Sequence, residues 1–342
     1  MVTQQPITLR DVARAAEVHP STASRALNVE TRPLVNDGTV ARVLAAAEAL
    51  GYEPNSLARG LKLNRTFQVG FVLPDLTNPL FPPMVRGLED SLNGAKYTVV
   101  IANTDNDADK ERSVLDAMLR RRVDGLVLAT ARRHDPAIDG LREAGMPLVL
   151  VNRTTEDGGV PSVTGDDHAG IGMALRHLVE LGHRRIAYVG APTSVSTGLA
   201  RYQAFVSWAR SEGIEVDADL MVSADWFQED PGANAFRELL ERDVSFTAVV
   251  AANDLIALGC YDVATEQGIS VPGEVSIVGY NDMPFADKLS PPLTTVHVPV
   301  YEIGRRAADL LLETIDQPTS MADAIRLRPE LIVRGSTQPP VS

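Results

Sequence analysis

Residues 7–28 read ITLRDVARAAEVHPSTASRALN and contain two short helical patterns separated by a three-residue turn. In the first pattern, apolar residues recur at helical spacing over 9–16, and Thr8 is placed to cap the N-terminus. The second covers 20–27 and begins with Pro20, which a first turn tolerates because its missing N–H would have no partner there. Two helices joined by so short a turn predict a helix-turn-helix, which places its second helix in the major groove of DNA.

The sequence that follows extends this helical head. A third helix is predicted over 37–50, where Asn36 can cap the start and Gly51 can end the helix. Another short helical stretch comes after it. We therefore expect an all-α DNA-binding domain over 1–54, followed by a hinge helix and linker over 55–65.

Side chains on and beside the second helix have the chemistry that DNA requires. Arg25 can form a fork on a guanine edge or bind a phosphate, and small hydroxyl and amide side chains suit phosphate oxygens. A three-helix pattern taken alone fits a plain helical cap equally well. The predicted DNA contacts in the head are Thr8, Pro20, Ser21, Thr22, Ser24, Arg25 and Asn28.

The charge is divided unevenly along the chain. A formal charge of −13 argues at first against a nucleic-acid partner, because phosphate binding relies on Lys and Arg. Residues 1–65, however, carry 8 basic and 6 acidic side chains, whereas the rest of the chain carries 24 and 39. A mildly basic head on a strongly acidic body is consistent with a nucleic-acid module fused to a second module.

From residue 66 onward, buried strand patterns alternate with amphipathic helices. The expected strands cover 69–73, 98–102, 125–129, 148–151, 185–190, 248–252 and 275–279, and the expected helices cover 82–92, 110–121, 169–181, 200–212 and 255–267. This alternation implies right-handed crossovers and parallel sheets covered on both faces. The units are too many for one sheet and their count restarts near 160–168, so the fold class is α/β with two doubly wound subdomains and a ligand cleft between them.

These segments resemble, in order, the LacI/GalR family of bacterial transcriptional regulators. The resemblance is carried in the head by ITLRDVARAAEVHPSTASRALN and LVNDGTVARVLAAAEALGYEPNSLARGLK, and in the body by VGFVLPDLTNPLF, HLVELGHRRIAYVG, AANDLIALGCYDVA and VSIVGYNDMPFADKLSPPLTTVH. It implies a homodimer on double-stranded, palindromic operator DNA and a core like that of periplasmic sugar-binding proteins. The strand exchange typical of that core predicts one subdomain from 66–165 and 298–327 and another from 166–297 and 328–342.

The resemblance also implies a hinge helix near 55–63, in which Leu61 wedges into the minor groove at the operator centre and Asn55 is a further DNA contact. This stretch is shorter than the about 12 to 15 residues that an isolated helix needs in water, and Gly60 makes the helix about 1 kcal/mol less favourable than Ala would. We expect this stretch to become helical on DNA. The alternative is a plain linker with Leu61 packed on the core.

The family's ligand-contacting positions map onto Leu80, Phe81, Asp166, Thr197, Arg201, Phe227, Asn253 and Asn281. Aromatic faces beside amide, carboxylate and guanidinium groups suit a small polar effector, with a sugar favoured over a purine. Each residue also has a structural alternative: Asp166 and Asn253 can cap helices, the aromatic rings can be core, and Arg201 can pair with an acid. Asn281 is followed by Asp282 where the family often has Asp, so either side chain could face the cleft.

Two positions in the head depart from the family pattern. Glu17 stands in the turn where Gly is usual, and Gly adopts positive φ at little cost. His19 stands where Ser usually caps the second helix. Both departures are expected to lower the stability of the head.

Other functional classes fit less well. The chain contains no GxGxxG after a strand, no P-loop and no GxSxG, so we expect neither an enzyme nor a cofactor. His177 and His183 are six residues apart, which does not match a helical metal pair, and no metal is expected. Short apolar runs, no signal-peptide pattern at the start and the single Cys260 favour a cytoplasmic protein without a membrane partner. A periplasmic-type solute-binding protein is the alternative, but it would account for the core alone.

Overall fold

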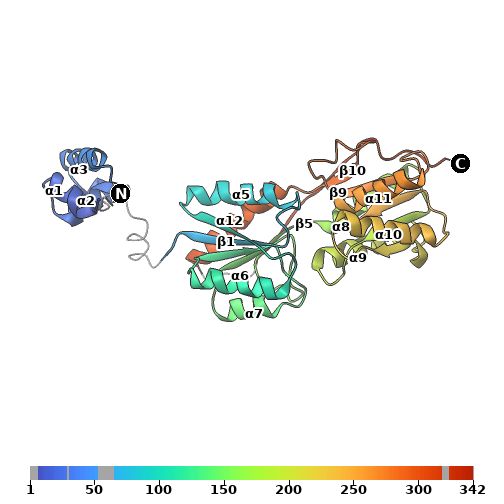
Figure 1. Cartoon of the computed structure of the whole chain (residues 1–342), viewed down its shortest axis with the longest axis horizontal. Helices are drawn as coiled ribbons and strands as arrows, with labels where there is room; N and C mark the ends of the chain where they lie inside the picture. The colour runs from blue at the N-terminus through green and yellow to red at the C-terminus, as the bar shows by residue number, and fades with distance from the viewer. Residues whose placement is uncertain (1–6, 29–30, 53–64, 318–322, 342) are drawn as a thin grey trace, which may run out of the picture. The chain divides into compact units, whose positions relative to one another are not determined.

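The computed structural model describes residues 7–28, 31–52, 65–317 and 323–341. The chain divides into two compact units, Met1–Thr66 and Phe67–Ser342 (Figure 1). The predicted hinge contacts Asn55 and Leu61 lie outside the described residues.

The described part of the first unit contains α1 (Leu9–Ala15), α2 (Pro20–Leu27), the short 3-10 helix η1 (Arg32–Leu34) and α3 (Asp37–Leu50). The three α-helices enclose a small core that includes Val12, Ala23 and Val43, each fully buried. Alanines on the inner face of α2 let the helices approach closely. The predicted helix-turn-helix is confirmed, and α2 begins and ends at the expected residues.

The helix ends in this unit show how the local sequence fixes the turns. Thr8 donates to the Asp11 carboxylate from both its N–H, at 3.0 Å, and its hydroxyl, at 2.6 Å. His19 does cap α2, because its Nδ1 accepts the Ser21 N–H at 3.3 Å. Gly51 ends α3 with φ of 62°, and Glu17 occupies the turn between α1 and α2 with φ of 53°.

Glu17→Gly should stabilise the first unit by about 1 kcal/mol, because a side chain in the left-handed region is strained and Gly is not. Glu17→Ala, which keeps a Cβ atom, should not give this gain. Calorimetric melting of the full chain, with the transition of the first unit resolved, checks both variants. A lower melting temperature for Glu17→Gly would contradict the assigned strain.

The second unit contains two six-stranded sheets. The first has the order β11-β5-β4-β3-β1-β2, and all its strand pairs are parallel. Its strands are β1 (Gln68–Leu73), β2 (Thr98–Asn103), β3 (Gly125–Leu128), β4 (Leu148–Val151), β5 (Ser162–Gly165) and β11 (Ala324–Leu327). In Figure 1, α5 (Phe81–Gly94) and α12 (Val300–Asp316) cover one face, and α6 (Ala108–Arg120) and α7 (Pro136–Glu143) cover the other.

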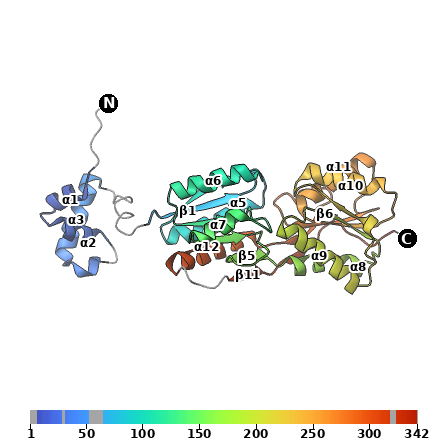
Figure 2. The same cartoon turned by 90° about the horizontal axis from the view of Figure 1, so that it is seen from below.

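The second sheet has the order β12-β10-β9-β8-β6-β7, and β12 is antiparallel to β10. Its strands are β6 (Ile186–Gly190), β7 (Met221–Ser223), β8 (Ala248–Ala251), β9 (Ser276–Asn281), β10 (Thr294–His297) and β12 (Glu330–Ile332). The covering helices are α8 (Asp167–Glu180), α9 (Ser196–Ser211), α10 (Glu229–Glu241) and α11 (Asp254–Gln267), with the short 3-10 helix η2 (Ala218–Leu220) before β7. Figure 2 shows α8 and α9 on one face of this sheet and α10 and α11 on the other.

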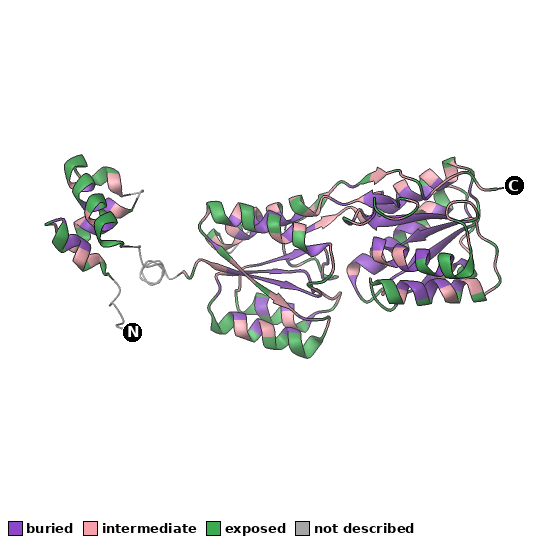
Figure 3. Ribbon diagram, turned by 45° about the horizontal axis from the view of Figure 1, so that its top comes forward, coloured by how far each residue is buried: buried purple, intermediate pink, exposed green. Residues whose placement is uncertain are grey.

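The central strands of both sheets are buried on their two faces, as Figure 3 shows in purple. This burial explains why they are continuous apolar runs and not alternating patterns. The predicted α/β class with two doubly wound sheets is therefore confirmed. The chain passes between the sheets after β5, after β10 and after β11. Within the described ranges, no helix has both the length and the hydropathy needed to cross a bilayer.

Candidate functional site

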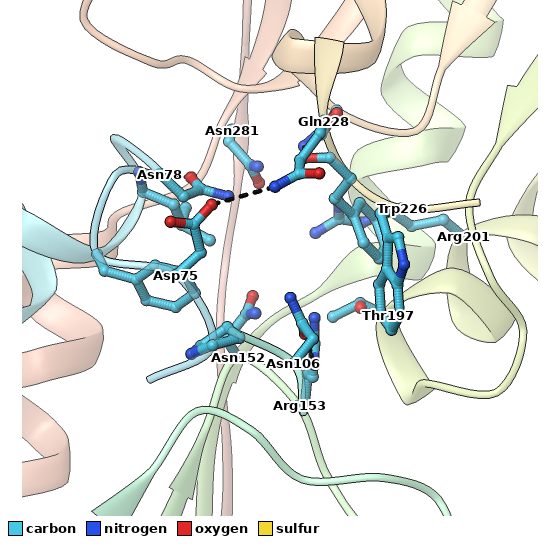
Figure 4. A pocket seen from close by; sticks show the side chains of 15 residues that line it. Asp75, Asn78, Asn106, Asn152, Arg153, Thr197, Arg201, Trp226, Gln228 and Asn281 are labelled. Atoms are coloured by element: carbon cyan, nitrogen blue, oxygen red, sulfur yellow. Dashed lines mark hydrogen bonds between the residues drawn. The ribbon is translucent and has the colours of Figure 1, made fainter. Parts of the chain in front are cut away.

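A cavity that opens to solvent, called here the effector cavity, lies where the carboxyl ends of strands from both sheets meet (Figure 4). Parallel strands direct their following loops to this edge, so side chains far apart in the sequence converge there. The cavity is lined by seven of the eight residues expected to contact an effector: Leu80, Phe81, Thr197, Arg201, Phe227, Asn253 and Asn281.

Asp166 is not among the residues that line this cavity. Its carboxylate accepts the Ala169 N–H at 3.0 Å and caps α8, and it faces a neighbouring groove. Asp166 thus caps α8, as the structural alternative expected, and its contact with an effector stays a prediction. The acid that meets Arg201 is the next residue, Asp167.

Arg201 is held by several contacts in the cavity and is 4% exposed. Its Nε donates to Asp167 Oδ1 at 2.9 Å, and its Nη1 donates to the Ala252 carbonyl at 2.7 Å. The guanidinium lies 4.0 Å from the centre of the Tyr280 ring. Burial by itself would lower the pKa of Arg201, but the Asp167 carboxylate and the surrounding groups raise it overall. Arg201 is thus a fixed, charged hydrogen-bond donor.

Two asparagines at the ends of strands of the second sheet also line the cavity. Asn253 caps α11 by accepting the Ile256 N–H at 2.8 Å, and its amide donates to the Phe227 carbonyl at 3.3 Å. Asn281 is buried at the end of β9 with φ of 106°. Such a conformation costs a non-glycine residue about 1 to 3 kcal/mol and is typical of functional sites.

The turn after β9 also shows which of two neighbouring side chains faces the cavity. Asn281 lines it, whereas Asp282 accepts from Arg334 Nη2 at 2.7 Å and lies 3.1 Å from His297 Nδ1. Asp282 also has positive φ, 56°. The strained turn therefore directs Asn281 to the cavity and Asp282 to the region where the chain crosses between the sheets.

The cavity also contains polar residues that the sequence analysis did not identify. They are Asp75, Asn78, Asn106, Asn152, Arg153, Trp226 and Gln228. A pattern that could have revealed three of them is a polar residue shortly after a strand: Asp75 follows β1, Asn106 follows β2, and Asn152 follows β4. Asn106 and Asn152 also have positive φ, 57° and 62°. Asn is one of the few non-glycine residues that adopts this conformation readily.

The part of the second unit built around the first sheet and the part built around the second sheet contact each other around the cavity. Gln228 Nε2 donates to Asp75 Oδ2 at 3.3 Å, drawn as the dashed line in Figure 4. Farther along the cleft, the Thr154 N–H donates to Ser196 Oγ at 2.8 Å, and Arg133 Nη1 donates to the Thr193 carbonyl at 3.3 Å. A ligand here would touch both halves. Over the described residues, no group of acidic, His or Cys side chains has a metal-binding arrangement.

The predicted DNA contacts in the first unit lie around one face of α2. Ala23 and Ala26 face the core, whereas Ser21, Ser24, Arg25 and Asn28 are exposed on the other side. Pro20 and Thr22 are partly exposed, and Thr8 is exposed beside α1. An exposed row of hydroxyl, amide and guanidinium groups on a second helix has the arrangement that a major groove can accept.

Comparison with known proteins gives two family matches. Residues 8–55 match the profile described as "Bacterial regulatory proteins, lacI family", and residues 175–337 match "Periplasmic binding protein-like domain". The ribose operon repressor of Escherichia coli strain K12 is 33% identical over 330 residues, which cover 96% of this chain and 99% of that protein.

Two solved structures are similar in fold and sequence. A transcriptional regulator, CelR, in complex with cellobiose matches with a TM-score of 0.75 and 32% identity over 96% of this chain and 99% of that chain. A regulator from Enterococcus faecium with bound ribose matches with a TM-score of 0.70 and 32% identity over 80% of this chain and 99% of that chain.

Proposed function

This chain belongs to the LacI family of bacterial regulatory proteins, and we propose that it is a transcriptional repressor that binds a palindromic operator as a homodimer under the control of a small sugar. It is a DNA-binding regulator whose periplasmic-binding-protein-like part binds a small-molecule effector. A solute-binding protein would leave the helix-turn-helix without a role. We assign the cleft a binding role without catalysis and place the protein in the cytoplasm with its DNA.

The composition of the cavity is the observation that supports a sugar. Amide side chains such as Asn253 and Asn281 both donate and accept hydrogen bonds, as the hydroxyl groups of a sugar do. Phe81, Trp226 and Phe227 offer apolar surface for the C–H face of a sugar ring. The similar proteins include a ribose operon repressor and solved regulators with cellobiose and with ribose, which is consistent with this effector class.

The test has two measurements on the full chain. Fluorescence anisotropy with the DNA upstream of its own gene should show specific binding, and a thermal-shift screen of monosaccharides, disaccharides and their derivatives should identify a stabilising compound. A ligand at about 100 times its Kd stabilises by about 2.7 kcal/mol, which such a screen detects. The same compound should change operator affinity. If only purines stabilise the protein and change operator affinity, the sugar assignment is wrong.

Arg25→Ala should weaken specific operator binding by about 1 to 3 kcal/mol and relax base preference at one position of each half-site. The reason is that Arg25 is exposed on α2 and can fork onto a guanine edge. Anisotropy against operators with single base changes measures the effect. An equal loss on every sequence would assign Arg25 to phosphate binding.

A further inference from the structure

A second, smaller cavity adjoins the effector cavity. The two share Asn106, Arg153 and Trp226. The second cavity, called here the side cavity, is further lined by Glu111, Thr130 and Arg132. One ligand can therefore contact Arg153 from the effector cavity and extend a substituent into the side cavity.

Arg153 has hydrogen-bonding capacity that the protein does not use. Only 6% of the residue is exposed, and its Nη1 donates to Asn106 Oδ1 at 3.4 Å. Its Nε has no hydrogen-bond partner among the residues that the structure describes. Burial lowers the pKa of Arg153 to about 10, so the group is still protonated at neutral pH. A buried cation with an unpaired N–H is costly unless something completes its contacts.

The nearby acidic side chains do not complete the hydrogen bonds of Arg153. Glu111 Oε1 accepts the Thr130 hydroxyl, and the cation within ion-pair distance of Glu111 is Arg132, at 3.9 Å. Burial raises the pKa of Glu111. Asp135 lies close by but does not line the cavity, because its carboxylate accepts backbone N–H groups of Arg132, Ala137 and Ile138. The lining thus has two guanidinium groups against one carboxyl.

We infer that the side cavity receives an anionic group of the effector, a carboxylate or a phosphate, so that the effector is an acidic derivative of a sugar and not a neutral one. The inference rests on the function proposed above for the cleft. The anion accepts from the Arg153 guanidinium where it lines the side cavity, and the sugar ring lies in the effector cavity. Hydrogen bonds of this charged kind are shorter and about twice as strong as neutral ones.

Isothermal titration calorimetry on the full chain tests the assignment with three kinds of probe. Inorganic phosphate tests the anion alone. Ribose against ribose 5-phosphate and glucose against glucose 6-phosphate and gluconate test neutral sugars against phosphate and carboxylate derivatives. An acidic probe should bind about tenfold tighter than its neutral counterpart or better, and the phosphate and carboxylate arms identify the source of the charge.

Two variants should give effects of opposite sign, and a third is the control. Arg153→Gln should remove the preference for the acidic probe, because the cation is lost. Glu111→Gln should increase that preference severalfold, because it removes a negative charge and keeps an acceptor for Thr130. Arg112→Gln, an exposed arginine on α6 that pairs with Asp109, should change nothing. A purely structural role for Arg153 and Glu111 would not give these opposite changes.

Any of three results would overturn the inference: neutral and acidic probes bind equally, the preference is unchanged in Arg153→Gln, or no acidic probe binds. The proposed function fails separately. If a neutral sugar changes operator affinity, the function stands without the anionic effector. If an acidic probe binds through Arg153 but leaves operator affinity unchanged, the side cavity stands and the proposed regulation does not.

Discussion

Arg201→Met should abolish the effect of the effector on operator binding and lower the free energy of unfolding by about 3 to 5 kcal/mol. The substitution removes the fixed donor from the effector cavity. It also leaves the Asp167 carboxylate, 13% exposed, without its partner at 2.9 Å, and the Ala252 carbonyl without its donor. Urea unfolding measures the stability, and operator anisotropy with a titrated effector measures the response.

A double variant separates the two losses. Arg201→Met combined with Asp167→Asn removes both charges, so most of the stability should return while the effector response stays absent. Arg176→Met is a suitable control, because Arg176 pairs with Glu212 at 3.4 Å but its side chain is 51% exposed. That control should cost at most about 1 kcal/mol. If Arg201→Met is as mild as the control, or if the double variant responds to the effector, the role assigned to Arg201 is wrong.

Sequence patterns identified the elements that carry a strong local preference. Pro20 and the alanine spacing define α2, and apolar runs such as 248–252 define the central strands. The edge strands β11 and β12 were not identified, because they are three or four residues long and partly exposed. Their formation depends on pairing with β5 and β10, which are far away in the sequence. A local sequence pattern does not indicate which distant strand a segment will pair with.

The residues of the effector cavity could likewise be predicted only in part from the sequence. Positions carried over from the family resemblance supplied seven of the residues that line the cavity, but they included Asp166 and not Asp167, the acid that meets Arg201. Both acids stand at the start of the same helix, and only the helix register shows that one caps α8 while the other meets Arg201. The unpaired Nε of Arg153 was equally out of reach, because hydrogen-bond satisfaction depends on the whole surrounding fold.

Asp254 is a fully buried carboxyl behind the turn that presents Asn281. Its Oδ2 accepts the Met283 N–H at 2.6 Å, and its Oδ1 accepts the Thr295 hydroxyl at 2.5 Å. The carboxyl thus joins the start of α11 to the strained turn and to β10. Burial raises the pKa of Asp254 to about 7 from an ordinary value of 3.8, and hydrogen bonds from Thr295 and Met283 offset part of that rise.

The sign of the resulting pH dependence follows from this raised pKa. The folded chain binds the Asp254 proton more tightly than the unfolded chain, so this group's stabilisation is fully present below about pH 4 and is lost as pH rises to about 7. The total is about 4 kcal/mol, of which about 2 to 3 kcal/mol is lost between about pH 5 and about pH 8. Asp254→Asn stays neutral and should not show this loss.

Urea unfolding of wild type and Asp254→Asn across this pH range measures the difference directly. Because other titrating groups are common to both proteins, the gap between their unfolding free energies isolates Asp254. As pH rises, the unfolding free energy of Asp254→Asn should increase relative to that of wild type. Asp116 is an exposed acid on α6, and the control variant Asp116→Asn should follow wild type throughout. A gap that stays constant within about 0.5 kcal/mol would mean that Asp254 does not change protonation in this range. In that case its hydrogen bonds from Met283 and Thr295 would be sufficient to keep a buried charge behind the effector cavity.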